Sequence, residues 1–316
     1  MISYGKQSID KSDLNSIIKC LKSDFLTQGP LAKKFEKNLS NYLGFKYCIS
    51  VSSGTSSMFL ISQLLRWSKG DIIAMPPITF LSTASIIEQC NAKPLFIDIN
   101  SDNYCMCPDK LEKELIKDKK KKIKAAVITD FGGVPADWKK FYNLKKKYNF
   151  TLINDQCHAL GSKYYGSKKY SSKYCDFSTL SFHPVKAITT GEGGALLTNS
   201  KIIDKKAKIL RSHGIERDSK TYWKYKVKTL GYNLRLSDIN CALGISQLKR
   251  INKFINKRRK IALIYNNFFK KNSLFKIPEN NKNFSNSYHL YPLLINFEKL
   301  KISKIFLIRY FLKKKN

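Results

Sequence analysis

Short apolar runs alternate with amphipathic stretches through the first half of the chain. The apolar and β-branched runs, which we predict to be buried strands, cover residues 47–52, 71–76, 94–99, 125–131 and 151–155. Stretches with the apolar spacing of a helix lie between them, at 54–66, 80–90, 107–117 and 135–148. This strict alternation predicts an α/β fold, with a mostly parallel central sheet that helices cover on both faces.

The alternation of predicted strands and helices ends after Asp155. Two strand-like runs, 175–182 and 194–199, follow one another with only a loop between them. A helix is predicted to begin near Ser200, at the start of the next amphipathic stretch. The second half of the fold therefore departs from simple strand and helix alternation.

The pattern of apolar residues in the last third of the chain predicts a smaller unit. A long helical region extends from about residue 237 to 272, and the run YHLYPLLINF at 288–297 predicts the first strand of that unit. We expect a large domain over residues 1–245, which includes N-terminal helices. Residues 246–316 would form a long helix and an incomplete small C-terminal domain.

Charge adds little to this picture. The chain of 316 residues has 58 Lys and Arg against 23 Asp and Glu, a formal net charge of +35. Dense basic runs occur at 117–124 and 256–260, and the other lysines are scattered. A nucleic-acid site needs basic residues clustered on one face, so we expect no nucleic-acid partner. DNA binding suggested by charge remains an alternative, which salt-sensitive binding would test.

Cysteine usage and hydropathy favour a soluble, cytoplasmic protein. The N-terminus lacks the apolar core of a signal peptide, and no apolar run approaches the ~20 residues of a membrane-spanning helix. The cysteines form neither a CxxC pair nor a zinc-type spacing with histidines, so we expect reduced thiols and no metal site. They stand at positions 20, 48, 90, 105, 107, 157, 175 and 241.

Three polar motifs follow predicted strands, where ligands bind in open α/β sheets. In SVSSGTSS, Gly54 lets a backbone come close and the free amides of a helix start suit a phosphate, although such a turn is also an ordinary helix cap. Asp155 ends an apolar strand with His158 three residues later, and its carboxylate either meets a cation or caps the next turn. Lys186 stands among small and hydroxylated residues in SFHPVKAITTGEGG.

These motifs together suggest one cofactor. A lysine in a partly dehydrated pocket is a nucleophile towards a carbonyl, although for Lys186 taken alone a solvated lysine is the favoured interpretation. Pyridoxal 5′-phosphate (PLP) needs such a lysine, an acidic partner for its ring nitrogen and a phosphate cup. Lys186, Asp155 and the turn at Gly54 supply these three parts.

Six blocks of sequence also resemble one family, the DegT/StrS-type sugar-nucleotide aminotransferases, which have the aspartate-aminotransferase-like fold, type I among PLP-dependent transferases. The resemblance covers about residues 1–297. The blocks are SGTSS, TFLSTASIIEQCNAKPLFIDI, NDQCHALGSKYYG, SFHPVKAITTGEGGALLTN, RSHGI and GYNLRLSDINCALGISQL. The resemblance is greatest to the subgroup that acts in pseudaminic acid synthesis.

The resemblance implies a role for individual residues. Lys186 would bind the cofactor covalently and move a proton between the cofactor and substrate carbons, while Asp155 would contact the ring nitrogen. His158 would approach the phenolic oxygen of the ring, and Phe80 would stack on its face. The residues implied to hold the phosphate are Gly54, Thr55, Ser56 and Ser181, with Asn233 reaching in from the other subunit of a homodimer.

The implied reaction is a transamination from L-glutamate to a UDP-linked keto-sugar, with a UDP-4-keto-6-deoxy-N-acetyl-hexosamine aminated at C4 as the specific expectation. Relatives without the lysine use the cofactor for dehydration, so Lys186 favours transamination. Gln156 and Cys157 depart from the small residues usual in the family at these positions, which could alter the pocket.

The C-terminus is a further departure from the family. Its members continue past residue 316, and the ending IFLIRYFLKKKN resembles the result of a frameshift or early stop. We expect the strand at 288–297 to lack neighbours, leaving an exposed edge and apolar surface. An impaired or non-enzymatic cofactor-binding homologue is therefore the alternative function.

Overall fold

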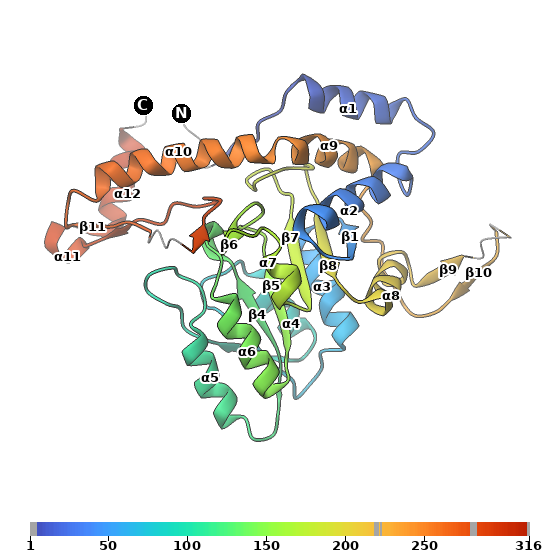
Figure 1. Cartoon of the computed structure of the whole chain (residues 1–316), viewed down its shortest axis with the longest axis horizontal. Helices are drawn as coiled ribbons and strands as arrows, with labels where there is room; N and C mark the ends of the chain where they lie inside the picture. Colours follow the sequence, from blue (N-terminus) through green and yellow to red (C-terminus); the bar gives the residue numbers. More distant parts are fainter. Residues whose placement is uncertain (1–4, 218–220, 222, 279–282, 315–316) are drawn as a thin grey trace.

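The computed structural model describes residues 5–217, 221, 223–278 and 283–314 (Figure 1). A seven-stranded sheet forms its centre, with the strand order β1-β8-β7-β5-β4-β2-β3. β8 runs antiparallel to both of its neighbours and the other neighbouring pairs are parallel, which confirms the mostly parallel sheet. The strands are β1 (Tyr47–Val51), β2 (Ile72–Met75), β3 (Lys93–Phe96), β4 (Ile123–Thr129), β5 (Thr151–Asp155), β7 (Phe177–Ser181) and β8 (Gly194–Thr198).

Helices cover both faces of this sheet. On one face the fully buried side chains of Trp138 and Phe141 pack with residues of β4 and β5. On the other face Met58, Ile61 and Ala207 pack against residues of β1, β2 and β8. The helices are α3 (Gly54–Leu65), α4 (Ser82–Gln89), α5 (Pro108–Lys117), α6 (Trp138–Tyr148), α7 (Tyr170–Tyr174) and α8 (Lys201–Arg211), with a 3-10 turn, η1, at Phe131–Gly133.

The long helical region predicted for 237–272 is two helices, α9 (Asp238–Lys249) and α10 (Ile251–Phe269), which lie end to end across one edge of the molecule (Figure 1). The chain leaves helical geometry at Arg250, whose φ is −98° and ψ 0°. The guanidinium of Arg250 forms ion pairs with Asp10 and Asp13. The break thus lies where α9 is tied to the N-terminal segment.

Two N-terminal helices, α1 (Lys11–Leu21) and α2 (Pro30–Leu43), pack on α9. The buried carboxylate of Asp238 accepts hydrogen bonds from the amides of Gly29, Leu31 and Ala32, at 2.7, 2.8 and 3.2 Å. First-turn amides have no acceptor within their own helix. A carboxylate from a distant part of the chain therefore caps α2.

The strand predicted at 288–297 is wrong over most of its length. β13 covers only Leu294–Ile295 and pairs antiparallel with β11 (Phe275–Lys276). Tyr288 has a φ of +51°, which breaks an extended run, and the amides of Ser287 and Leu290 bond to the carbonyls of Gly133 and Gly132. The segment before β13 is therefore a loop that covers a turn of the large unit.

Short elements complete the described chain. Two antiparallel pairs are β6 (Lys163–Tyr164) with β12 (Phe284–Ser285), and β9 (Ile215–Arg217) with β10 (Tyr225–Val227), and the second projects from the body in Figure 1. Two helices, α11 (Phe297–Leu300) and α12 (Lys304–Lys313), follow β13. No described helix is long and apolar enough to cross a membrane. The domain division at residue 245, which falls within α9, stays a prediction.

Candidate active site

A cavity of about 650 Å³ lies at the carboxyl ends of β5 and β7. Its walls come from the start of α3, the segment before α4, the turn after β5, the loop between β7 and β8, and the segment before β13. Because parallel strands end at the same edge of a sheet, residues distant in sequence meet there. The cavity therefore brings together several of the motifs that the sequence singles out.

Asp155 is the last residue of β5 and is 7% exposed. Its Oδ1 accepts a hydrogen bond from the amide of Cys157 at 3.2 Å. Within the described chain this carboxylate forms no ion pair with a lysine, arginine or histidine. A buried carboxylate without a cation is costly. Asp155 therefore suits a cationic group bound in the cavity.

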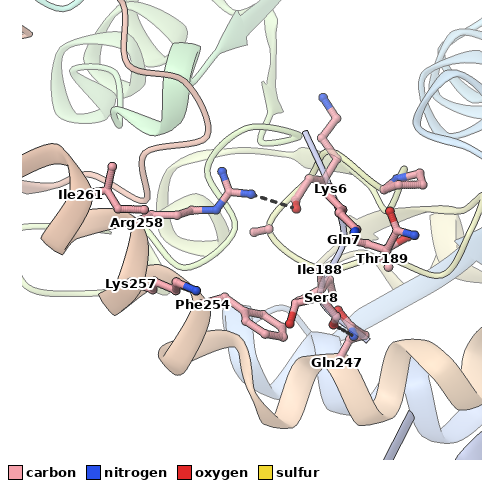
Figure 2. Close-up of a pocket in the computed structure, with 13 residues that line it drawn as sticks. Lys6, Gln7, Ser8, Ile188, Thr189, Gln247, Phe254, Lys257, Arg258 and Ile261 are labelled. Carbon is pink, nitrogen blue, oxygen red and sulfur yellow. Dashed lines mark hydrogen bonds between the residues drawn. The ribbon is translucent and has the colours of Figure 1, made fainter. Parts of the chain in front are cut away.

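Lys186 lies in the loop that joins β7 to the antiparallel strand β8. Hydrogen bonds from Phe182 to Gly193 and from Thr190 to Phe182 close the base of this loop, and the amide of Lys186 bonds to the carbonyl of His183 at 2.9 Å. Lys186 has no carboxylate partner in the part of the chain described. It lines the large cavity and also a second one of about 220 Å³ (Figure 2).

The start of α3 forms a narrow cradle beside Lys186. Ser53 caps the helix, because its Oγ accepts a hydrogen bond from the amide of Ser56 at 3.0 Å. The amides of Gly54 and Thr55 have no acceptor within the helix. A Cβ on Gly54 would lie only 3.0 Å from the Cβ of Ser181, so glycine keeps the cradle open. This geometry suits a phosphate group.

The rings of two histidines are in contact in the wall of the cavity. The rings of His158 and His289 have centroids 4.2 Å apart and planes inclined by 32°. The Nδ1 atoms of both are buried without a hydrogen-bond partner in the described chain. Burial and the charge of Lys186 lower the pKa of His158 to about 4 against the opposing effect of Asp155. Burial, with His158 next, lowers the pKa of His289 to about 2.

A buried network of hydrogen bonds around the carboxylate of Asp130 supports the carboxyl end of β5. The Asp130 carboxylate accepts hydrogen bonds from the amide of Ala136, Trp138 Nε1, Asn154 Nδ2 and the Tyr170 hydroxyl, at 2.8, 3.0, 3.1 and 2.6 Å. Burial raises the pKa of Asp130 to about 7, although these donors act in the opposite direction. Because Asn154 precedes Asp155, the network fixes the strand end that presents Asp155.

The structure brings most, but not all, of the predicted site residues together. Of the predicted residues, those that line the cavity are Gly54, Thr55, Phe80, Asp155, His158, Ser181 and Lys186. Phe80 is 68% exposed. Ser56 is not among the lining residues, and its hydroxyl is hydrogen-bonded to those of Ser52 and Ser53. Asn233 is exposed on the surface, where it pairs with Ser212, and does not reach the cavity of its own chain.

Sequence reasoning missed His183, His289 and Leu290, which also line the cavity. His183 lies in the same motif as Lys186 and could have been found from it. His289 and Leu290 were assigned to a strand. The proline at position 292, unusual in the middle of a strand, was the available sign of a loop.

Comparison with known proteins identifies the family. The family model described as the DegT/DnrJ/EryC1/StrS aminotransferase family matches residues 7–315. The chain belongs to this aminotransferase family. It is 42% identical over 295 residues to the UDP-4-amino-4,6-dideoxy-N-acetyl-beta-L-altrosamine transaminase of Campylobacter jejuni, covering 93% of this chain and 77% of that one. The Helicobacter pylori protein of the same name is 33% identical, with 96% and 80% covered.

Solved structures of other aminotransferases have the same fold. Helicobacter pylori PseC, described as an aminotransferase involved in the biosynthesis of pseudoaminic acid, is 32% identical with a TM-score of 0.87, covering 95% of this chain and 79% of that one. TlmJ of Streptoalloteichus hindustanus is 26% identical with a TM-score of 0.88, covering 94% and 80%. Spr1654 of Streptococcus pneumoniae in its PLP form is 26% identical with a TM-score of 0.82, covering 93% and 78%. The predicted family and fold class are confirmed.

Proposed function

We propose that this aminotransferase uses PLP to transfer the amino group of L-glutamate to a UDP-linked keto-sugar, with a UDP-4-keto-6-deoxy-N-acetyl-hexosamine aminated at C4. The observation that carries the proposal is one cavity that holds both Lys186 and the buried Asp155, neither of which has an ion-pair partner among the described residues. The names of the Campylobacter and Helicobacter relatives support the choice of sugar.

The residues present fit PLP. The cofactor combines an anionic phosphate, a ring nitrogen that binds a proton and an aldehyde that reacts with amines. The open cradle at Gly54 and Thr55 suits the phosphate, Asp155 suits a protonated ring nitrogen, and Lys186 is the amine. Phe80 offers an exposed ring beside the cavity against which a planar group can stack.

Each residue then has a defined task. When bound, PLP supplies an electrophilic carbon and a ring that accepts an electron pair. The amine of Lys186 holds the group and, once released from it, moves one proton between two carbons, as a general base and then as an acid. The carboxylate of Asp155 would keep a proton on the ring nitrogen. The neutral ring of His158 can donate a hydrogen bond to an anionic oxygen.

A homodimer is part of the proposal. Asn233 is exposed and, in this assignment, completes the phosphate cradle of the partner subunit. Leu230 and Val227 lie nearby in sequence and are 88% and 65% exposed, which is apolar surface that a partner could cover. We also assign the enzyme to the cytoplasm, in keeping with eight free cysteines.

The test is an absorbance and product assay on the full chain loaded with PLP. We expect a visible band that L-glutamate bleaches, and amination of the UDP-keto-sugar detected by mass spectrometry, with neither in Lys186→Ala. The reverse reaction, from the UDP-amino-sugar and 2-oxoglutarate, should yield glutamate. A Lys186-dependent band that ignores glutamate would favour the impaired homologue. Absence of any band would refute the cofactor assignment.

A further inference from the structure

The side chain of Arg258 in α10 donates hydrogen bonds to backbone carbonyls of two segments that line the large cavity, the lysine loop and the segment before β13. Its NH1 donates to the carbonyls of Tyr288 and His289, at 3.1 and 3.3 Å. Its NH2 donates to those of Val185 and Lys186, at 3.5 and 3.4 Å. Figure 2 shows Arg258 extending from α10 into the smaller cavity, with one of these bonds drawn. One guanidinium therefore joins the lysine loop to the segment that carries His289.

The guanidinium is held by dipoles and not by an opposite charge. Arg258 forms no ion pair with a carboxylate among the described residues. Burial lowers its pKa. Buried charges are usually paired, so an arginine satisfied by carbonyl oxygens is an expensive arrangement. Its planar fork of N–H groups can serve several acceptors at once, which the compact ammonium of lysine cannot do in the same geometry.

We propose that Arg258 is a positioning residue for the transamination, fixing the lysine loop and the His289 segment so that Lys186 and His289 face the same cavity. The inference rests on the proposed function, because it assigns Arg258 a task only through Lys186. Arg258 donates to four backbone carbonyls, two in the segment that carries His289 and two in the lysine loop. Its loss would remove a guanidinium that bonds to both segments at once.

The neighbouring arginine is a matched control. Arg259 is also half-buried on α10, and burial also lowers its pKa. Its Nε donates to the carbonyl of Asn286 at 2.9 Å, and its NH2 has no partner in the described chain. Arg259 therefore contacts the same C-terminal segment but not the lysine loop. The variants Arg258→Gln and Arg259→Gln remove the same charge from adjacent positions.

The first experiment is hydrogen exchange on the full chain without PLP. The amides of Lys186 and Thr190, which bond within the lysine loop, report its order. We expect exchange at these amides to be about ten-fold faster in Arg258→Gln, as a lost charge-assisted hydrogen bond predicts. Arg259→Gln should leave them unchanged. Amides of β4 and β5 should exchange as in the parent chain in both variants, which shows that they fold.

The second experiment measures PLP binding by the visible band. We expect about ten-fold weaker binding in Arg258→Gln, little change in Arg259→Gln, and incomplete recovery in Arg258→Lys, because lysine keeps the charge but not the fork. Equal effects of the two glutamine variants, or full recovery with lysine, would overturn the proposal. If the parent chain forms no band, the proposed function fails, while the exchange experiment still decides whether Arg258 orders the loop.

Discussion

The two histidines in contact, His158 and His289, predict a specific dependence of stability on pH. In the unfolded chain a histidine binds a proton below a pH of about 6.5, whereas His158 in the folded chain stays neutral down to about 4. Between these values the unfolded chain binds more protons, so acidification favours unfolding. The contribution of His158 is complete above pH 6.5 and is lost as the pH falls towards 4. His289 acts in the same direction.

The size of the effect follows from the difference of about 2.5 pH units between the two pKa values of His158. At about 1.4 kcal/mol for each pH unit, the full loss is about 3.5 kcal/mol, and about 2 kcal/mol is lost by pH 5. This is a sizeable part of the 5–15 kcal/mol by which domains are typically stable.

The assay compares the parent chain with His158→Gln, whose side chain is neutral at every pH. Urea unfolding followed by circular dichroism gives the free energy of unfolding at pH 7.5, 6 and 5. Asp130 opposes the histidines, because its raised pKa makes the folded chain bind the extra proton and gain stability as the pH falls. Asp130 is present in both proteins, so the difference between them isolates His158.

We expect the parent chain to lose about 2 kcal/mol more than His158→Gln between pH 7.5 and 5. The Hε1 signal that disappears from the NMR spectrum in the variant identifies His158, and its titration should lie near pH 4. Parallel stability curves for the two proteins would refute the reasoning, as would a His158 signal that titrates near 6.5.

Two further substitutions test the cradle and the cap of α2. Gly54→Ala should fold normally but bind PLP about ten-fold more weakly, because its Cβ would lie 3.0 Å from that of Ser181; equal PLP affinity would contradict the cradle. Asp238→Ala should lower the free energy of unfolding by roughly 3 kcal/mol in urea, since three amides lose a charged acceptor, and Asp238→Asn should lose less. A midpoint unchanged in Asp238→Ala would show that this cap contributes nothing.

Much of the fold could be predicted from the sequence, because buried parallel strands and amphipathic helices leave strong local patterns. Asp155 and Lys186 could be found for a similar reason, since each stands out against its apolar or small neighbours. Pro292 marks the segment 288–292 as a loop, but the conformation of this loop could not be predicted, because it depends on partners distant in sequence. The carbonyls of Gly132 and Gly133 and the guanidinium of Arg258 hold it away from an extended run.

The break at Arg250 has the same physical origin. The helical pattern continues across it, and the interruption coincides with ion pairs to Asp10 and Asp13 near the other end of the chain. Tertiary contacts of this kind override local preference and leave no trace in the nearby sequence. The ring contact between His158 and His289 likewise joins residues 131 positions apart, which no motif spacing indicates.

The position of β1 in the sheet has a consequence for synthesis of the chain. β1 is the edge strand of the sheet and pairs with β8, so its pairing is complete only once Thr198 has been made, 147 residues after Val51. At the usual 5–20 residues per second, roughly 7–30 s pass between the emergence of the two strands. During that time β1 and α3 have apolar faces that the sheet will later bury. The start of α3 is therefore fixed in the sheet late, after β5 and the lysine loop have been made, and until then the apolar faces of β1 and α3 are open to contact with other unfolded chains.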